Sequence, residues 1–255
     1  SKEPTRKLTV DAHYDVLQLG RGTNMFNEGN ILASIMGAGT SQKLLPVTEV
    51  SAQYDHEVNG NFNTASLLMF RQYHSNAFAP MQTLDGNVPI RTITSGEANV
   101  QLRFSHNETV TRGHFIKTYT HTDFPIVTLG LSGGVFGLNP WDMSGVPAGM
   151  TGSRGYFKPE LSLDWKFRIP PVGMTTLHAN VGTIVGRVPY TILHLHEGNG
   201  TYLLDKTSFS TMDFFEFASD SWATLLIDHN FYGFFLGKIP LLKKLQLREA
   251  ITLRA

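Results

Sequence analysis

The chain has 255 residues, and its 21 Lys and Arg residues balance its 21 Asp and Glu residues, so the formal net charge is zero. Because there is no excess of positive charge, the composition does not favour a nucleic-acid partner. The lack of cysteine excludes thiolate metal sites, cysteine nucleophiles and disulfides. Only 16% of the residues are charged, fewer than is typical of soluble domains, yet no apolar run is long enough for a transmembrane helix.

From the first residues onward, apolar and polar side chains alternate. Such alternation predicts β-strands with one apolar and one polar face, because successive strand side chains point to opposite sides. The clearest examples are 8–16, 97–105 and 160–168. In the last of these, Leu161, Leu163, Trp165 and Phe167 alternate with Glu160, Ser162, Asp164, Lys166 and Arg168. Further strands are predicted at 28–38, 46–58, 62–74, 112–120, 124–136, 174–186, 210–230 and 245–255.

Turn residues separate these strands at 59–61 (NGN), 124–125 (FP) and 170–173 (PPVG). A longer segment, 137–154, is rich in Gly, Pro and Met. Helical periodicity is nearly absent, and no linker or repeat divides the chain. The sequence therefore predicts an all-β fold in a single region spanning 1–255, an up-and-down antiparallel meander of about eleven strands.

Two architectures fit such strands. A soluble sandwich or small barrel turns the apolar faces inward, whereas a transmembrane β-barrel turns them outward to lipid and lines its interior with polar residues. The second is favoured by the several charges on each polar face, by strands of 10 to 13 residues, which suit a tilted membrane crossing, and by the alternation of short turns with long loops.

The last third of the chain carries a more specific resemblance. The matching pieces are 189–199 (PYTILHLHEGN), 212–245 (MDFFEFASDSWATLLIDHNFYGFFLGKIPLLKKL) and 247–250 (LREA), with weaker matches at 99–108 and 124–134. They resemble the C-terminal region of a Bacteroidota outer-membrane family, in which a carboxypeptidase-regulatory-like sandwich precedes a barrel similar to the Bam/Tam assembly factors and bacterial surface antigens. The resemblance implies a non-enzymatic protein of the bacterial outer membrane, in contact with lipid and without a cofactor.

Two expectations follow from this resemblance. The family's barrel has sixteen strands, so this chain is expected to be an incomplete fragment whose sheet does not close. The implied role is to assist the insertion or export of surface proteins or lipoproteins, which would then be the client partners. The first alternative is a passive or substrate-specific pore, and the second is an outer-membrane hydrolase. The candidate residues for hydrolysis are Asp220, Ser221 and His229. However, the sequence around Ser221 is not a nucleophile elbow such as G-x-S-x-G.

The HLHEGNG stretch at 194–200 raises the question of a metal site. His194 and His196 would share one face of a strand, and imidazoles suit Zn²⁺, but no third ligand has an evident claim. The glycines favour a loop, and the resemblance implies a loop that folds into the barrel lumen. We therefore expect a lumenal-loop motif formed by His194, His196, Glu197, Gly198 and Asn199, and no bound metal.

Two further groups of residues are assigned to the membrane boundary. The resemblance implies a periplasmic turn at 232–245, whose Pro240 should break any helix, with Gly233, Phe234, Phe235, Ile239, Pro240, Leu241 and Leu242 as its residues. Aromatic side chains are enriched where a membrane meets water. The expected interfacial aromatics are Trp141, Trp165, Phe214, Phe215 and Trp222.

Overall fold

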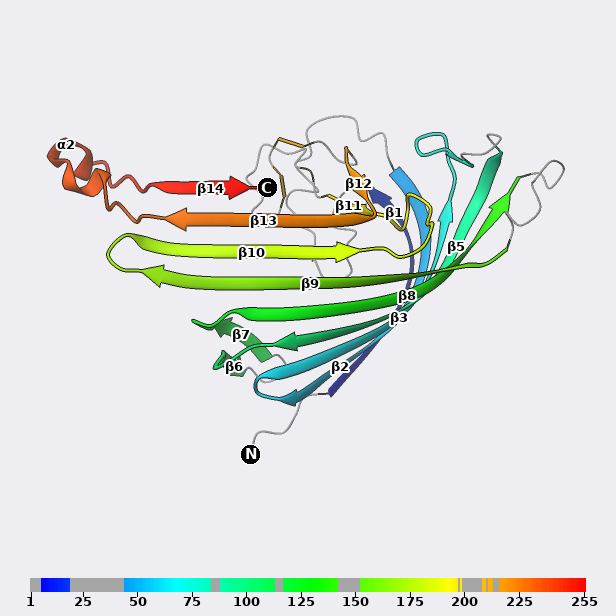
Figure 1. The fold of residues 1–255 in the computed structure, drawn as a ribbon, viewed down its shortest axis with the longest axis horizontal. Coiled ribbons are helices and arrows are strands. Elements are labelled where there is room, and N and C mark those ends of the chain that lie inside the picture. The colour runs from blue at the N-terminus through cyan, green and yellow to red at the C-terminus, as the bar shows by residue number, and fades with distance from the viewer. Residues whose placement is uncertain are drawn as a thin grey trace.

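The computed structural model describes residues 6–18, 44–83, 88–112, 117–141, 152–196, 198, 208–209, 211–212 and 216–255. These residues form an antiparallel ten-stranded sheet in the order β1-β2-β3-β5-β8-β9-β10-β13-β14, with β4 paired to β5 (Figure 1). Its strands are β1 (Arg6–Gln18), β2 (Leu44–Asn59), β3 (Phe62–His74), β4 (Met81–Gln82), β5 (Pro89–Phe104), β8 (Ile126–Pro140), β9 (Arg154–Ile169), β10 (Gly173–Thr183), β13 (Ser221–Asn230) and β14 (Ala250–Arg254). The all-β antiparallel meander expected from the sequence is confirmed.

Two small sheets and two short helices lie outside this sheet. β6 (Thr109–Arg112) pairs with β7 (Lys117–His121), and β11 (His194–Leu195) pairs with β12 (Ala218–Ser219). The 3₁₀ helix η1 (Leu236–Lys238) and the helix α2 (Pro240–Lys243) follow β13. Within the described ranges, no helix has the length and apolar character needed to cross a membrane.

Several predicted strands differ from the observed ones. The strand expected at 112–120 is instead part of the β6–β7 hairpin, because β5 pairs directly with β8 and leaves no place between them. Of the segment 210–230, only 218–219 and 221–230 are strand among its described residues, and of 245–255 only 250–254 is strand. The strand expected at 28–38 lies outside the described residues. β1 and β14 are the two ends of the sheet order, and their described residues do not pair with each other.

The connections leave the sheet at two ends. We call the turn end the one that carries the described residues 60–61, 105–112, 117–125, 170–172 and 231–249. The loop end is the one that carries the described residues 75–83, 88, 141, 152–153, 184–196 and 216–220. At the turn end, the side chain of Asn59 accepts a hydrogen bond from the backbone N–H of Asn61 at 2.9 Å, which closes the two-residue turn between β2 and β3.

Strand register gives the sheet two chemically different faces. The outer face is apolar and exposed, with Leu8, Val10, Tyr14 and Val16 of β1, Val50 and Tyr54 of β2, Leu68 and Phe70 of β3, Val100 and Phe104 of β5, Val135 of β8, Phe157, Leu161 and Ile169 of β9, Val181 of β10, and Ile251 and Leu253 of β14. The inner face carries the alternating polar residues, among them Glu49, Arg71, Glu97, Lys158, Glu160, Asp164, Asn180 and Asp228.

The buried core occupies the inner face near the loop end. One cluster joins Leu45 and Val47 of β2, Tyr73 of β3, Ile90 and Ile93 of β5, and Leu195 of β11, together with Ala79 and Met81. A second joins Phe136, Tyr156, Ile184, Ile192 and Trp222. Both clusters therefore depend on side chains from the segment 184–196, which precedes and enters β11.

Two adjacent residues of this segment show that the sheet curls about its inner face. The ring of His194 stacks on Trp222 of β13, whereas Leu195 joins the cluster from β2, β3 and β5. In the sheet order β5, β3 and β2 stand four to six strands away from β13, which would be about 19–29 Å in a flat sheet with roughly 4.8 Å between strands. Neighbouring residues reach both regions because the sheet forms a trough, and Figure 1 shows β11 and β12 lying within it.

Candidate functional site

The segment 184–196 is held against the inner face by both backbone and side-chain contacts. The backbone N–H of Ile184 donates to the carbonyl of Asp220, and that of His196 donates to the carbonyl of Phe217. β11 pairs with β12 through His194↔Ser219 and Leu195↔Ala218. Leu195 is 2% exposed. The segment is thus packed against the inner face of the sheet, and the lumenal-loop assignment of the HLHEGN motif stays a prediction. Glu197 and Asn199 lie outside the described residues, and Gly198 is buried.

Trp222 is the centre of this packing. His194 stacks on its ring at a centroid distance of 4.0 Å and an interplanar angle of 4°. Its indole N–H donates a hydrogen bond to the side chain of Asn180. On the opposite strand, Gly182 pairs with Trp222, and a Cβ added at Gly182 would stand 2.2 Å from the indole ring. The glycine therefore leaves the space in which the ring lies flat over β10.

This placement corrects the expectation that Trp222 belongs to an outer interfacial belt. The indole is 5% exposed and lies on the inner face. The alternation along β13 assigns Trp222 to the same face as Asp228, because the two positions differ by an even number of residues. An aromatic ring near a strand end is thus not necessarily at the surface.

A second glycine–aromatic pair lies on the same face. Gly134 of β8 pairs with Tyr156 of β9, and an added Cβ at Gly134 would stand 2.7 Å from the phenol ring. The hydroxyl of Tyr156 donates to Glu97 of β5, across the intervening strand. The contact thus ties three neighbouring strands together through side chains. The sequence analysis did not identify this pair, although the glycines of the SGG run at 132–134 are a signal of close approach.

Charged residues also form contacts across the inner face. Arg71 of β3 donates to Glu49 of β2 at 2.5 Å, and the amide of Asn99 donates to Ser132. At the turn end, Arg103 holds Glu108 through both of its terminal nitrogens, each at 2.8 Å. Burial alone would raise the pKa of Glu108, but the hydrogen bonds from Arg103 and Ser105 hold that pKa below its ordinary value. The polar face is therefore an organised network of side chains.

Two of the expected interfacial aromatics lie near opposite ends of the sheet, Trp165 on the outer face of β9 and Trp141 directly after β8. Trp165 of β9 packs on Phe167 with ring centroids 4.3 Å apart, and its indole N–H donates to the carbonyl of Asp123 at 3.1 Å. Trp141, directly after β8, is 62% exposed and carries Arg91 over its ring at 5.3 Å. Phe214 and Phe215 lie outside the described residues.

At the turn end, the connection between β13 and β14 contains a cluster of aromatic and basic side chains. Gly233 has a φ of +85°, a conformation that glycine adopts without strain. Phe235 contacts Phe231 and Phe234 with centroids 5.1 and 4.9 Å apart, and the ammonium group of Lys238 lies 3.8 Å from the Phe234 ring centre. The expected turn residues Gly233, Phe234, Phe235, Ile239, Pro240, Leu241 and Leu242 all lie in this connection.

Pro240 differs from its expected role. It was expected to break a helix, but it occupies the first turn of α2, where a proline is tolerated because the first N–H groups of a helix have no intrahelical partner. Ile239 is extended, and the chain enters a four-residue helix.

Ser221 and His229, which were considered for hydrolase chemistry, do not contact each other. Ser221 and His229 lie on the same face of β13, eight residues apart, which is about 26 Å along a strand. The hydroxyl of Ser221 contacts that of Thr183 at 2.8 Å, and His229 contacts the hydroxyl of Thr175 at 2.8 Å. Both side chains are engaged in cross-strand pairs.

The comparisons with known proteins identify a family. Residues 33–255 match the C-terminal domain of a family of unknown function, DUF5686. The chain belongs to this family. No curated protein matches the chain, and no solved structure does. The matched range includes every strand from β2 to β14, so the whole sheet except β1, together with the docked segment and the turn end, falls within the DUF5686 domain.

His194 and His196 are not arranged as ligands of one metal ion. Their rings meet edge to face at 5.0 Å, His194 is stacked on Trp222, and Nε2 of His196 contacts the hydroxyl of Ser219 at 3.1 Å. Among the described residues, no group of three or more His, Asp or Glu side chains could hold a metal ion.

We expect elemental analysis of the chelator-washed DUF5686 domain to show no stoichiometric transition metal. The reason is that both imidazoles already have other partners, and zinc sites in proteins require three or four ligands. One tightly held Zn²⁺ that disappears in a His194→Gln, His196→Gln variant would contradict this expectation.

Docking of the segment should depend on pH through His194, which lies in β11, outside the ten-stranded sheet. Burial, together with the smaller effects of His196 and Lys158, lowers the pKa of His194 from 6.5 to about 3. A group whose pKa is lowered by folding must be neutral in the folded state. Its contribution to stability is therefore complete above pH 6.5 and is lost as the pH falls from 6.5 towards about 3.

The measurement is hydrogen exchange of residues 184–196, corrected for the intrinsic effect of pH on exchange. Protection should fall through this range in the wild-type domain. In His194→Phe, which keeps an aromatic ring on Trp222 but cannot titrate, most of that pH dependence should vanish. Equal pH profiles for the two proteins would show that His194 is not responsible.

Proposed function

We propose that the DUF5686 domain is a non-enzymatic transmembrane β-barrel region of a bacterial outer membrane, which assists the insertion or export of surface proteins or lipoproteins. One observation carries the membrane part of this proposal. The exposed outer face of the sheet is apolar from β1 to β14, while the polar and charged residues gather on the inner face. A soluble sheet has the opposite arrangement, whereas a membrane barrel requires this one.

The energetic argument concerns the exposed side chains of the outer face. Val10 and Leu68 are 68% and 63% exposed, and an apolar side chain of this size gains roughly 1.5–3 kcal/mol when it leaves water. Large contiguous apolar patches on a protein surface indicate a lipid or protein contact. Contact with lipid would remove all of these side chains from water, because the apolar face is continuous across neighbouring strands.

The stagger of the strands supports a barrel-like tilt. Following the ladder from Phe62 in β3 through Phe104 and Val127 leads to Leu163 of β9. β9 continues from there to Ile169, six residues further towards the turn end, or about 20 Å at roughly 3.3 Å per residue. Successive strands are thus displaced along their length, as they are when strands tilt relative to a barrel axis.

The segment 184–196 packs over the inner face of the sheet, and this supports a role other than an open pore. Leu195 and Ile192 pack into the two core clusters, so the segment 184–196 fills part of the space above the inner face. The assignment to insertion or export rests on the resemblance of 189–199 and 212–245 to the Bam/Tam-like barrels. The polar inner face is the feature that favours the alternative, a substrate-specific pore.

The deciding experiment combines localisation, conductance and depletion. The protein should fractionate with the outer membrane and resist carbonate extraction, its reconstituted form should show little steady conductance in planar bilayers, and its depletion should reduce the amount of surface lipoproteins. Stable channels together with unchanged surface lipoproteins would favour the pore. Release of the protein by carbonate would contradict the membrane assignment itself.

A further inference from the structure

The connection between β13 and β14 presents basic and apolar side chains together. Figure 1 shows its helix α2 projecting past the ends of both strands at the turn end. Residues 231–249 include four basic residues and one acidic residue, and all four basic side chains are exposed. Large apolar side chains beside them are about half exposed. We call the following residues the turn patch: Lys238, Lys243, Lys244, Arg248, Phe235 and Ile239.

Ring contacts connect the turn patch to the apolar outer face of the sheet. His229 pairs with Ile251, which is 61% exposed on the outer face. Phe231 packs on the ring of His229 with centroids 4.3 Å apart, so it continues the same face two residues later. Phe235 packs on Phe231 at 5.1 Å and is itself 53% exposed. The outer face therefore runs into the turn patch without a break.

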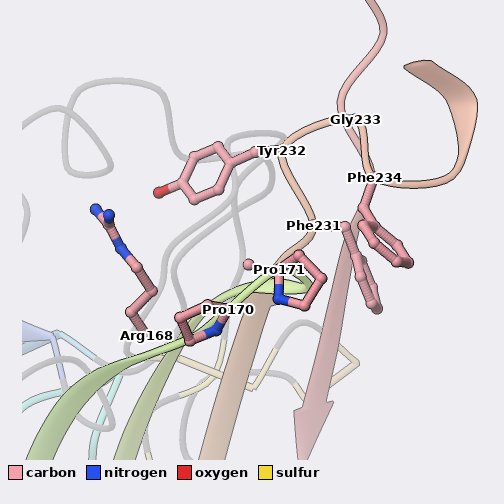
Figure 2. Close-up of a pocket in the computed structure, with 8 residues that line it drawn as sticks. Arg168, Pro170, Pro171, Phe231, Tyr232, Gly233 and Phe234 are labelled. Carbon is pink, nitrogen blue, oxygen red and sulfur yellow. The ribbon is translucent and has the colours of Figure 1, made fainter. Parts of the chain in front are cut away.

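The aromatic rings also keep the turn patch apart from the polar inner face. Figure 2 shows the rings of Phe231 and Phe234 on one side of the connection, and Arg168 and Tyr232 on the other. The register places Arg168 on the inner face of β9, in line with the other polar residues of that face. The ammonium group of Lys238 lies over the Phe234 ring. This cation is thus on the side of the outer face.

The positive charge of the turn patch is not balanced within the connection. Its one carboxylate, Glu249, accepts a hydrogen bond from the backbone N–H of Leu236, and backbone N–H groups of this turn hold the pKa of Glu249 below its ordinary value. In the part of the chain that the structure describes, no ion pair joins Lys243, Lys244 or Arg248 to a carboxylate. The patch is therefore a local excess of cations on a chain with no net charge.

We propose that the turn patch binds the anionic headgroups of a phospholipid leaflet. The inference rests on the proposed membrane location of the domain. A leaflet presents negative phosphates directly beside its acyl chains, and the turn patch presents cations directly beside exposed apolar side chains. Lys and Arg residues near an anionic leaflet are attracted to its surface potential. Because the outer face and the turn patch are continuous, lipid that covers the one meets the other with its headgroups.

An acidic protein is the other occupant that the positive charge would suit. Lipid is favoured because the charge does not stand alone: Phe235 and Ile239 are 53% and 46% exposed among the cations. Contact with acidic side chains would leave these two in water. An anionic leaflet accounts for both the cations and the apolar side chains with a single partner.

The test places a fluorescent probe in the turn patch of the whole protein. The chain has no cysteine, so Ile239→Cys provides one labelling site in this region. The protein is reconstituted in phosphatidylcholine vesicles with small, equal amounts of phosphatidylglycerol or phosphatidylcholine that carry a nitroxide quencher near the headgroup. Labelled phosphatidylglycerol should quench the probe about threefold more strongly or better, since each Lys or Arg near an anionic surface strengthens binding by roughly fivefold. At about 0.5 M salt, screening should make the two lipids nearly equal.

Two double variants, each made with the probe in place, locate the effect. Lys243→Gln with Lys244→Gln should lose at least half of the preference for phosphatidylglycerol. Lys166→Gln with Arg168→Gln is the matched control, because it removes two cations from the inner face of β9 near the same end. It should keep the preference. Equal quenching by the two lipids in the wild-type background, or equal losses in the two double variants, would overturn the proposal.

Further readouts separate the other outcomes. A probe at 239 that is quenched by aqueous iodide and by neither lipid would overturn the lipid assignment in favour of an acidic protein. A second probe, at Leu163→Cys on the outer face of β9, reports membrane contact independently of the turn patch. Quenching at 163 by a nitroxide deep in the acyl chains, with no lipid preference at 239, refutes the turn patch alone. No quenching at 163 refutes the membrane location on which the inference depends.

Discussion

Leu163→Arg is expected to destabilise the protein in lipid by about 2–4 kcal/mol, the cost of a cation on the lipid face near the middle of a membrane barrel. Leu163 lies near the centre of β9 on the outer face, in register with Val127 of β8 and Ala179 of β10. None of these neighbours can pair with a guanidinium group. The measurement is reversible denaturant unfolding of the protein folded into lipid vesicles.

The matched control is Ser162→Arg, one residue earlier in the same strand. Ser162 faces the inner side, next to Asn180 and close to the carboxylates of Glu160 and Asp164. An arginine there meets polar partners and water, and we expect a change within about 1 kcal/mol. Equal losses for the two variants, or a greater loss for Ser162→Arg, would mean that the outer face of β9 does not contact lipid.

Trp222→Ala is expected to cost about 3–5 kcal/mol, as the removal of a large buried aromatic side chain does. The substitution removes the stacking partner of His194, the donor to Asn180 and the cover over Gly182. Denaturant unfolding in micelles gives the free energy, and limited proteolysis within 184–196 reports whether this segment has left the inner face.

Trp165→Ala is the control for aromatic loss in general. Its ring lies on the outer face, where it packs on Phe167 and its N–H donates to the carbonyl of Asp123. We therefore expect a loss of about 1–2 kcal/mol, in the range of one aromatic pair and one hydrogen bond. Proteolysis within the segment 184–196 should be unchanged in this variant. A Trp222→Ala protein as stable and as protease-resistant as Trp165→Ala would contradict the assignment of Trp222 to the core.

A double-mutant cycle tests the packing of the indole over glycine. Gly182→Ala alone should destabilise by about 1–3 kcal/mol, since the new methyl group overlaps the ring and the side chain must shift. In the Trp222→Ala background the same change should cost little, giving a large coupling energy. Gly130→Ala, also on the inner face but with its nearest neighbour at 3.8 Å, should be tolerated alone. Additive losses at Gly182 and Trp222 would refute the contact.

The alternation of residue types was sufficient to predict which side chains share a face. In β9, Leu161, Leu163, Trp165 and Phe167 lie opposite Glu160, Ser162, Asp164 and Lys166, as the sequence predicted. The prediction succeeds because the two-residue period of a strand is a local property of the backbone. The same reasoning located β3 at 62–74 with its bounds unchanged, since the turn residues before it are also local signals.

The partners of each strand and the depth of each side chain depend on contacts between distant residues, which local alternation does not describe. The segment 112–120 has strand character, yet it became part of a separate hairpin because β5 and β8 pair along their whole length. Trp222 resembled a surface aromatic and is buried because Gly182, forty residues earlier, leaves space for its ring. Alternation therefore determined the two faces of this protein, whereas only the register and curl of the sheet decided that His194 and Leu195 would pack inside it.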